Sequence, residues 1–161
     1  MPNKDGELRN KVTQLWKANR TQEAGRLIFE DLSREARVEW AANILGTVVA
    51  RASIECPSIE RILYIAKNPQ EWKTAYDANS IARNQARELS QIRIRSVEQN
   101  LLLISLTMAF LVARVIYNAT DPSDPFDEDN GWSIASSLKK MVEMLGDNEF
   151  SQTSLSVLCG T

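Results

Sequence analysis

Histidine is absent from this chain of 161 residues, and its absence excludes more chemistry than any other feature of the composition. Imidazole is the usual general base near neutral pH, the base of Ser-His-Asp and Cys-His sites, and a common ligand of zinc and haem. Carboxylate and lysine chemistry stay available, but no two acids fall on adjacent turns of an inward helical face. We therefore predict no catalytic residue and no enzymatic activity.

Cysteine is also scarce, because Cys56 and Cys159 are the only two and lie far apart in the sequence. They form no metal-spaced pair, so the choice is between one disulfide and two free thiols. We favour free thiols in a reducing compartment. The N-terminal sequence MPNKDGELRNK has no apolar core of the kind that secretory signals carry, so we expect a cytoplasmic protein.

Glycine-rich phosphate loops are missing as well, since neither GxGxxG nor GxxxxGK[ST] occurs, and we expect no cofactor. The net charge of −2 argues against non-specific nucleic-acid binding, which depends on neutralising phosphates. An apolar fraction of 43% and a charged fraction of 25% are typical of soluble globular proteins. The length suits one domain over residues 1–161.

One stretch, Leu101–Tyr117, is almost continuously apolar and is interrupted only by Ser105, Thr107 and Arg114. A helix that is apolar on every side has to be covered on every side. A membrane span needs about 20 apolar residues and tolerates an arginine poorly, and a strand is rarely this long. Of these alternatives we favour a central buried helix, at about 97–118, and expect no membrane contact.

The other apolar residues recur at spacings of three and four, which is the pattern of amphipathic helices. The segments are 6–18, 22–31, 34–53, a short one after Pro57, 69–89 and 132–145. Ser96 and Gln99 fit a capping box before the central helix, and Asn68 with Glu71 fits another. Gly46 suggests close approach of a second helix. The sequence thus predicts an all-α single-domain bundle of about seven helices around the central one.

The segment 120–131, TDPSDPFDEDNG, predicts an acidic loop that contains proline and is long for a connection between helices. A calcium loop with Gly131 at its sixth position would need Asp and Glu where Phe126 and Ser137 stand, so we predict no metal site. The loop is instead a candidate partner surface. Its acidic residues are Asp121, Asp124, Asp127, Glu128 and Asp129.

Three further segments carry polar or uncertain features. Tyr76, Asn79, Arg83 and Arg114 define a candidate ligand pocket, although an acid such as Glu39 could instead pair with Arg114. The arginines near the start of the central helix are expected to pair with nearby glutamates or to cap carbonyl groups; they are Arg83, Arg87, Arg93 and Arg95. The Ser- and Thr-rich tail at 148–161 is expected to be loosely ordered or to form one more packed turn.

These features predict a non-enzymatic helical module for protein–protein interaction or regulation, with a protein partner or self-association. Small helical bundles of this kind are common among bacterial interaction modules, including immunity-like proteins that neutralise a toxin by binding it. That is an analogy of fold class. The alternative function is a helical bundle that binds a small molecule in the candidate pocket.

Overall fold

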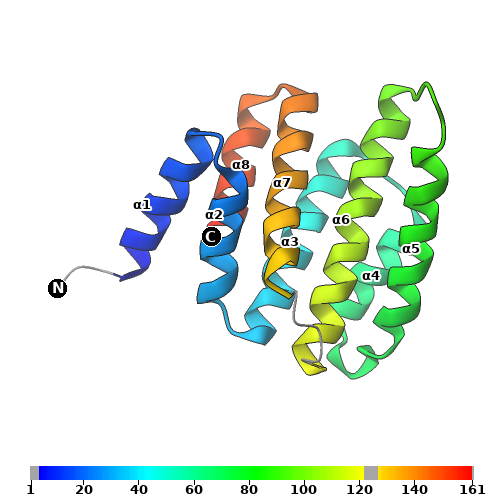
Figure 1. Cartoon of the computed structure of the whole chain (residues 1–161), viewed down its shortest axis with the longest axis horizontal. Helices are drawn as coiled ribbons and strands as arrows, with labels where there is room; N and C mark the ends of the chain where they lie inside the picture. Colours follow the sequence, from blue (N-terminus) through cyan, green and yellow to red (C-terminus); the bar gives the residue numbers. More distant parts are fainter. Residues whose placement is uncertain (1–3, 122–126, 161) are drawn as a thin grey trace.

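The fold, seen in a computed structural model that describes residues 4–121 and 127–160, is an all-α bundle (Figure 1). Within those residues the chain forms eight α-helices, one short 3-10 helix and no strand. The α-helices are α1 (Lys4–Lys17), α2 (Thr21–Asp31), α3 (Arg34–Ala52), α4 (Pro57–Lys67), α5 (Thr74–Ser90), α6 (Val97–Thr120), α7 (Asp127–Leu145) and α8 (Asn148–Leu158). The 3-10 helix η1 (Pro69–Glu71) lies between α4 and α5. The predicted all-α bundle around a central helix is confirmed.

The predicted central helix is α6, and α3, α4, α5 and α7 all pack on it. From Ser105 onward most of its side chains are buried, but those of residues 101–104 are only half-buried. The expectation of cover on every side is therefore wrong for the first two turns. By length and hydropathy α6 is also the one helix among the described residues that could cross a membrane, and half of its most apolar window is buried.

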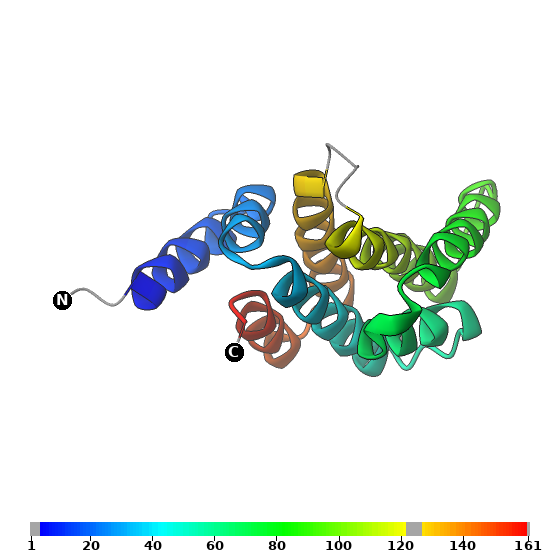
Figure 2. The same cartoon turned by 90° about the horizontal axis from the view of Figure 1, so that it is seen from below.

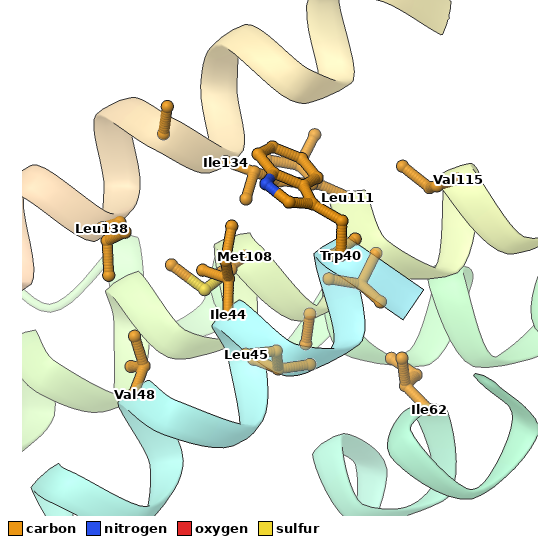
Figure 3. Packing of buried hydrophobic residues seen from close by; sticks show 14 of the residues in the cluster. Trp40, Ile44, Leu45, Val48, Ile62, Met108, Leu111, Val115, Ile134 and Leu138 are labelled. Atoms are coloured by element: carbon orange, nitrogen blue, oxygen red, sulfur yellow. The ribbon is translucent and has the colours of Figure 1, made fainter. Parts of the chain in front are cut away.

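The core is built mainly from α3, α6 and α7, whose apolar side chains point toward one another (Figure 3). Each such side chain contributes about 1.5–3 kcal/mol when it is fully removed from water. Those labelled in the figure are Trp40, Ile44, Leu45 and Val48 of α3, Ile62 of α4, Met108, Leu111 and Val115 of α6, and Ile134 and Leu138 of α7.

Helices α2 and α7 cross so closely that only glycine fits at the contact. A Cβ on Gly25 would lie 2.5 Å from the Cβ of Ala135 and 2.7 Å from the carbonyl oxygen of Gly131. A Cβ on Gly131 would lie 2.5 Å from Cγ of Phe29. The predicted loop at 120–131 is thus too long at both ends, because α6 runs to Thr120 and α7 begins at Asp127. Gly131 belongs to a helix contact and not to a turn.

Two other local predictions are wrong. Nothing lies within 4 Å of the Cβ that Gly46 would carry, so no helix approaches it closely. The side chain of Asn68 caps no N-terminus; its Nδ2 donates to the carbonyl oxygen of Tyr64, 2.8 Å away, at the end of α4. The capping box of α6 is confirmed, with both Ser96–Gln99 hydrogen bonds present.

The C-terminal segment is more ordered than expected and forms α8. Phe150 and Leu158 are buried, and Nε1 of Trp40 donates to the carbonyl oxygen of Leu158 at 2.9 Å. Asp147 caps the helix through the backbone N–H groups of residues 149 and 150. The same carboxylate accepts hydrogen bonds from Arg51, which ties α8 to α3.

Three of the helical glycines should respond in opposite directions to alanine. Gly25→Ala or Gly131→Ala is expected to lose about 1–3 kcal/mol of stability, because backbone or buried atoms must shift. Gly46→Ala is expected to gain about 0.5–1 kcal/mol, because alanine lowers the conformational entropy of the unfolded chain and meets nothing in the folded one. Urea unfolding followed by circular dichroism measures all three, and a loss at Gly46 would contradict the open surroundings described above.

The Asp147 cap should make the stability of the protein depend on pH in the acidic range. The Arg51 guanidinium, followed by the backbone N–H groups, holds the pKa of the Asp147 carboxyl below its ordinary value. A lowered folded pKa gives stability that is present above the unfolded pKa and is lost as the pH falls through the folded one. Asp147→Asn keeps a capping oxygen but no charge. Its urea midpoint should fall below that of the wild type at neutral pH, and the difference between the two midpoints should disappear as the pH falls below the lowered pKa of Asp147.

Candidate binding groove

A groove with a volume of about 740 Å³ lies between α3, α4, η1 and the end of α6. We call it the α3–α4 groove. Figure 2 looks along the helices from the end at which α3 begins and α6 finishes. Ligand sites in proteins typically measure about 300–1,000 Å³. Its apolar lining residues are Val38, Ala42 and Gly46 of α3, Leu63, Ile65 and Ala66 of α4, Pro69 of η1, Trp72, and Ile116 and Ala119 of α6.

Charged groups stand at the sides of this apolar floor. Glu35 and Glu39, one turn apart on α3, line one side, and Lys67 at the end of α4 lines another. None of the three makes an ion pair or a side-chain hydrogen bond among the described residues, and both carboxylates are exposed. The groove therefore combines an apolar floor with two uncompensated carboxylates and one ammonium group.

The pattern of the sequence did not reveal this groove. Glu35 and Glu39 lie on adjacent turns, but they flank the inward stripe of α3, where acidic residues usually face solvent. The signal that could have found them is Gly46, which lies on the same side of α3 two turns after Glu39. A glycine inside a strong helix costs about 1 kcal/mol against alanine. In this structure the missing side chain of Gly46 leaves the groove open, and no second helix packs against this residue.

The residues predicted to form a ligand pocket make contacts with other parts of the protein instead. Tyr76 stacks on Tyr117 with ring centroids 4.2 Å apart, and its hydroxyl donates to Asp121 at 2.7 Å. Nδ2 of Asn79 donates to the carbonyl oxygen of Phe110 at 2.6 Å.

The two arginines of that prediction lie apart from the groove too. Arg83 is exposed on α5, and Arg114 is half-buried on α6 with a partner other than Glu39. None of the residues Tyr76, Asn79, Arg83 and Arg114 lines the α3–α4 groove, which is formed by different residues.

The predicted acidic partner surface is only partly within the described residues. Asp121 is the C-cap residue that follows α6 and accepts the hydrogen bond from Tyr76, and Asp129 is exposed near the start of α7. Asp127 and Glu128 belong to the first turn of α7, while Asp124 lies outside the described residues. Among the residues searched, no three His, Cys, Asp or Glu side chains are grouped to hold a metal ion. The partner surface stays a prediction.

An exposed apolar turn connects α5 to α6, and we call residues 92–97 the apolar turn. The exposed fractions are 37% for Ile92, 88% for Ile94 and 67% for Val97. Arg95 fixes its shape, with Nε donating to Oδ1 of Asn100 at 2.7 Å and Nη1 donating to the carbonyl oxygens of residues 90 and 92. Residues 91–96 connect the two helices through a turn and a bend, without regular secondary structure.

The arginines around the apolar turn do not pair as predicted. Arg95 binds carbonyl groups, which is one of the two alternatives that the sequence predicted for these arginines. Arg83, Arg87 and Arg93 are exposed and make no ion pair among the described residues, so the predicted pairing with Glu88 and Glu98 is wrong. The turn is thus apolar at its tip and basic around it.

Both cysteines are free thiols, as expected. Cys56 is buried at the start of α4, where its sulfur lies 3.3 Å from the Ser58 hydroxyl. Cys159 is half-buried at the end of α8, and burial raises the pKa of its thiol, although Thr13 and Arg9 act in the opposite direction. A raised pKa leaves little thiolate on Cys159 at neutral pH, which makes its thiol a poor nucleophile.

Comparison of the chain with protein-family models, with curated proteins and with solved structures gave no match.

The hydrogen bond between Tyr76 and Asp121 can be followed by titration. The accepting carboxylate, and to a smaller extent burial, raises the pKa of Tyr76 above that of an ordinary phenol, because ionisation would break the bond and oppose two negative charges. In Asp121→Asn the phenolate of Tyr76 should form at lower pH. The measurement is phenolate absorbance, with Tyr76→Phe subtracted to remove Tyr64 and Tyr117. An unchanged titration in Asp121→Asn would contradict the contact.

Proposed function

We propose that this protein is a non-enzymatic helical interaction module that binds an apolar segment of a partner protein, flanked by basic residues, in the α3–α4 groove. The observation that carries the proposal is the pairing of an apolar floor with the uncompensated carboxylates of Glu35 and Glu39. Neutralising a toxin is one form that such binding can take. The two free thiols are consistent with the cytoplasmic location that the proposal includes.

Affinity and selectivity would come from different parts of the groove. The floor of Val38, Ala42 and Leu63 offers non-directional apolar contact, which suits branched aliphatic side chains. Exposed ion pairs contribute only about 0.2–1 kcal/mol each, so Glu35 and Glu39 add little to affinity. They do penalise an acidic ligand, because juxtaposed like charges suppress wrong partners. The carboxylates therefore select the sign of the partner's charge.

A second candidate is the binding of a small molecule in the same groove. Its volume falls within the range of ligand sites, and Trp72 supplies an aromatic wall beside the aliphatic ones. A ligand with an apolar body and a cationic group would match the floor and the carboxylates. Under this candidate the ligand would contact the groove residues and not Tyr76, Asn79, Arg83 or Arg114.

The proposal can be tested with two synthetic peptides of equal length, one alternating Ile and Arg and the other alternating Ile and Glu. Fluorescence anisotropy should show the Ile/Arg peptide binding at least ~10-fold more tightly, a difference of about 1.4 kcal/mol. Gly46→Phe should weaken this binding by a similar factor, because its ring fills the groove without meeting other atoms at Cβ. Gly46→Ala is the matched control and should bind as the wild type does.

Two results would contradict a peptide-binding groove. One is equal affinity for both peptides, which would remove the role of Glu35 and Glu39. The other is unchanged binding by Gly46→Phe, which would place the peptide elsewhere on the surface. A third result would favour the small-molecule alternative. In it neither peptide binds, and a cationic apolar compound raises the thermal unfolding midpoint of the wild type but not that of Gly46→Phe.

A further inference from the structure

We propose that the occupant of the α3–α4 groove is the apolar turn of a second copy of this chain. The inference rests on the proposed binding function of the groove and names its partner. The two surfaces are complementary in both respects that matter for docking. One is an apolar hollow with carboxylates beside it, and the other is an apolar projection with arginines beside it.

The apolar turn has the shape of an insert. Ile94 exposes 88% of its surface and Val97 67%, whereas the next most exposed large apolar side chain among the described residues, Tyr64, exposes 55%. The turn is also held in place before binding. Arg95 ties it to residues 90, 92 and 100, and the Ser96–Gln99 capping box fixes the start of α6. A preformed insert loses little conformational entropy when it docks.

The apolar turn and the α3–α4 groove carry charges of opposite sign. The segment 83–98 carries four arginines and two glutamates, and Arg87 and Arg93 have no ion-pair partner among the described residues. The groove presents Glu35 and Glu39, which have no ion-pair partner within the part of the chain that the structure describes, together with one lysine, Lys67. The net charge of the whole chain is only −2, so general repulsion between copies is weak. Each surface therefore offers the charge that the other lacks.

The turn cannot reach the groove of its own molecule. The turn ends at Val97, the first residue of α6, whereas the groove includes Ile116, Ala119 and Thr120 at the other end of that helix. Twenty-four residues at about 1.5 Å each separate the two ends of α6 by roughly 36 Å. Figure 1 shows the turn at the top of α5 and α6, and the end of α6 at the bottom.

Two assemblies satisfy this contact. Copies joined in one direction form a chain or ring, and two antiparallel copies side by side can exchange turns reciprocally and close as a symmetric pair. A six-residue turn buries a small area, below the roughly 1,200 Å² of the smaller stable interfaces. We therefore expect association in the micromolar range, with the reciprocal pair favoured because it makes the contact twice.

The decisive experiment is complementation between two disabled variants, followed by sedimentation velocity and light scattering. Ile94→Glu removes the insert, and Gly46→Phe fills the groove. Each variant alone should stay monomeric at concentrations at which the wild type associates. Mixed in equal amounts they should form a heterodimer, because one keeps its groove and the other keeps its turn. Met144→Glu, a change at another exposed apolar residue, is the matched control and should associate as the wild type does.

A charge exchange tests the same contact without changing its apolar part. Glu39→Arg and Arg93→Glu should each weaken association by roughly 3–10-fold, as loss and reversal of a rim charge pair does. Mixing these two variants should recover affinity, since an arginine beside the groove then meets a glutamate beside the turn. Increasing salt should weaken the wild type but should have less effect on the double change to uncharged Gln at both positions.

Three outcomes would overturn the inference. A wild type that is monomeric throughout has no such contact, and if the Ile/Arg peptide still binds its groove, the proposed function stands while the second copy does not. Association that survives both Ile94→Glu and Gly46→Phe uses another surface. A monomer that binds vesicles of phosphatidylcholine and phosphatidylserine, and loses that binding in Ile94→Glu, uses the turn for a membrane and not for a second copy.

Discussion

The burial of α6 is the constraint on which the rest of this structure depends. The helix is apolar around most of its circumference, so a single amphipathic partner cannot cover it. Four helices, α3, α4, α5 and α7, pack on it, and α2 then packs on the outside of α7. The close α2–α7 crossing at Gly25 and Gly131 follows from this arrangement, because α7 must offer one face to α6 and another to α2.

Cover of α6 is uneven along its length, and the two surfaces of interest arise from that unevenness. At its start, residues 101–104 are half-buried and the preceding apolar turn is exposed. At its end, α3 and α4 stand far enough apart to leave the groove over Ile116 and Ala119. The helices that surround α6 differ in length and leave apolar surface at both of its ends. Arginines lie beside the apolar surface at its start, and Glu35 and Glu39 lie beside the apolar surface at its end.

The sequence predicted those parts of the fold that depend on periodicity. Val38, Ala41, Ile44, Leu45 and Val48 recur at helical spacing, and Ser96 with Gln99 marks the start of α6, so both helices could be placed. What could not be placed depends on neighbours distant in sequence. Gly25, Gly46 and Gly131 are the same residue type inside helices, but two accommodate a close crossing and one borders a groove. Asn68 likewise fits an N-cap locally and serves the preceding helix instead.

The candidate site was missed for a related reason. Glu35 and Glu39 carry no mark that separates them from any solvated acidic pair, because a groove is a relation between α3 and α4 and not a property of either. The apolar turn was visible as the alternation Ile-Arg-Ile-Arg, but alternation alone does not say which side faces water. Only the tertiary structure shows that Ile94 projects while Arg95 folds back to bind carbonyl groups. An isoleucine that gains nothing from folding contributes to stability only if something else covers it, and this is the physical reason to look for its partner at the opposite end of the same helix.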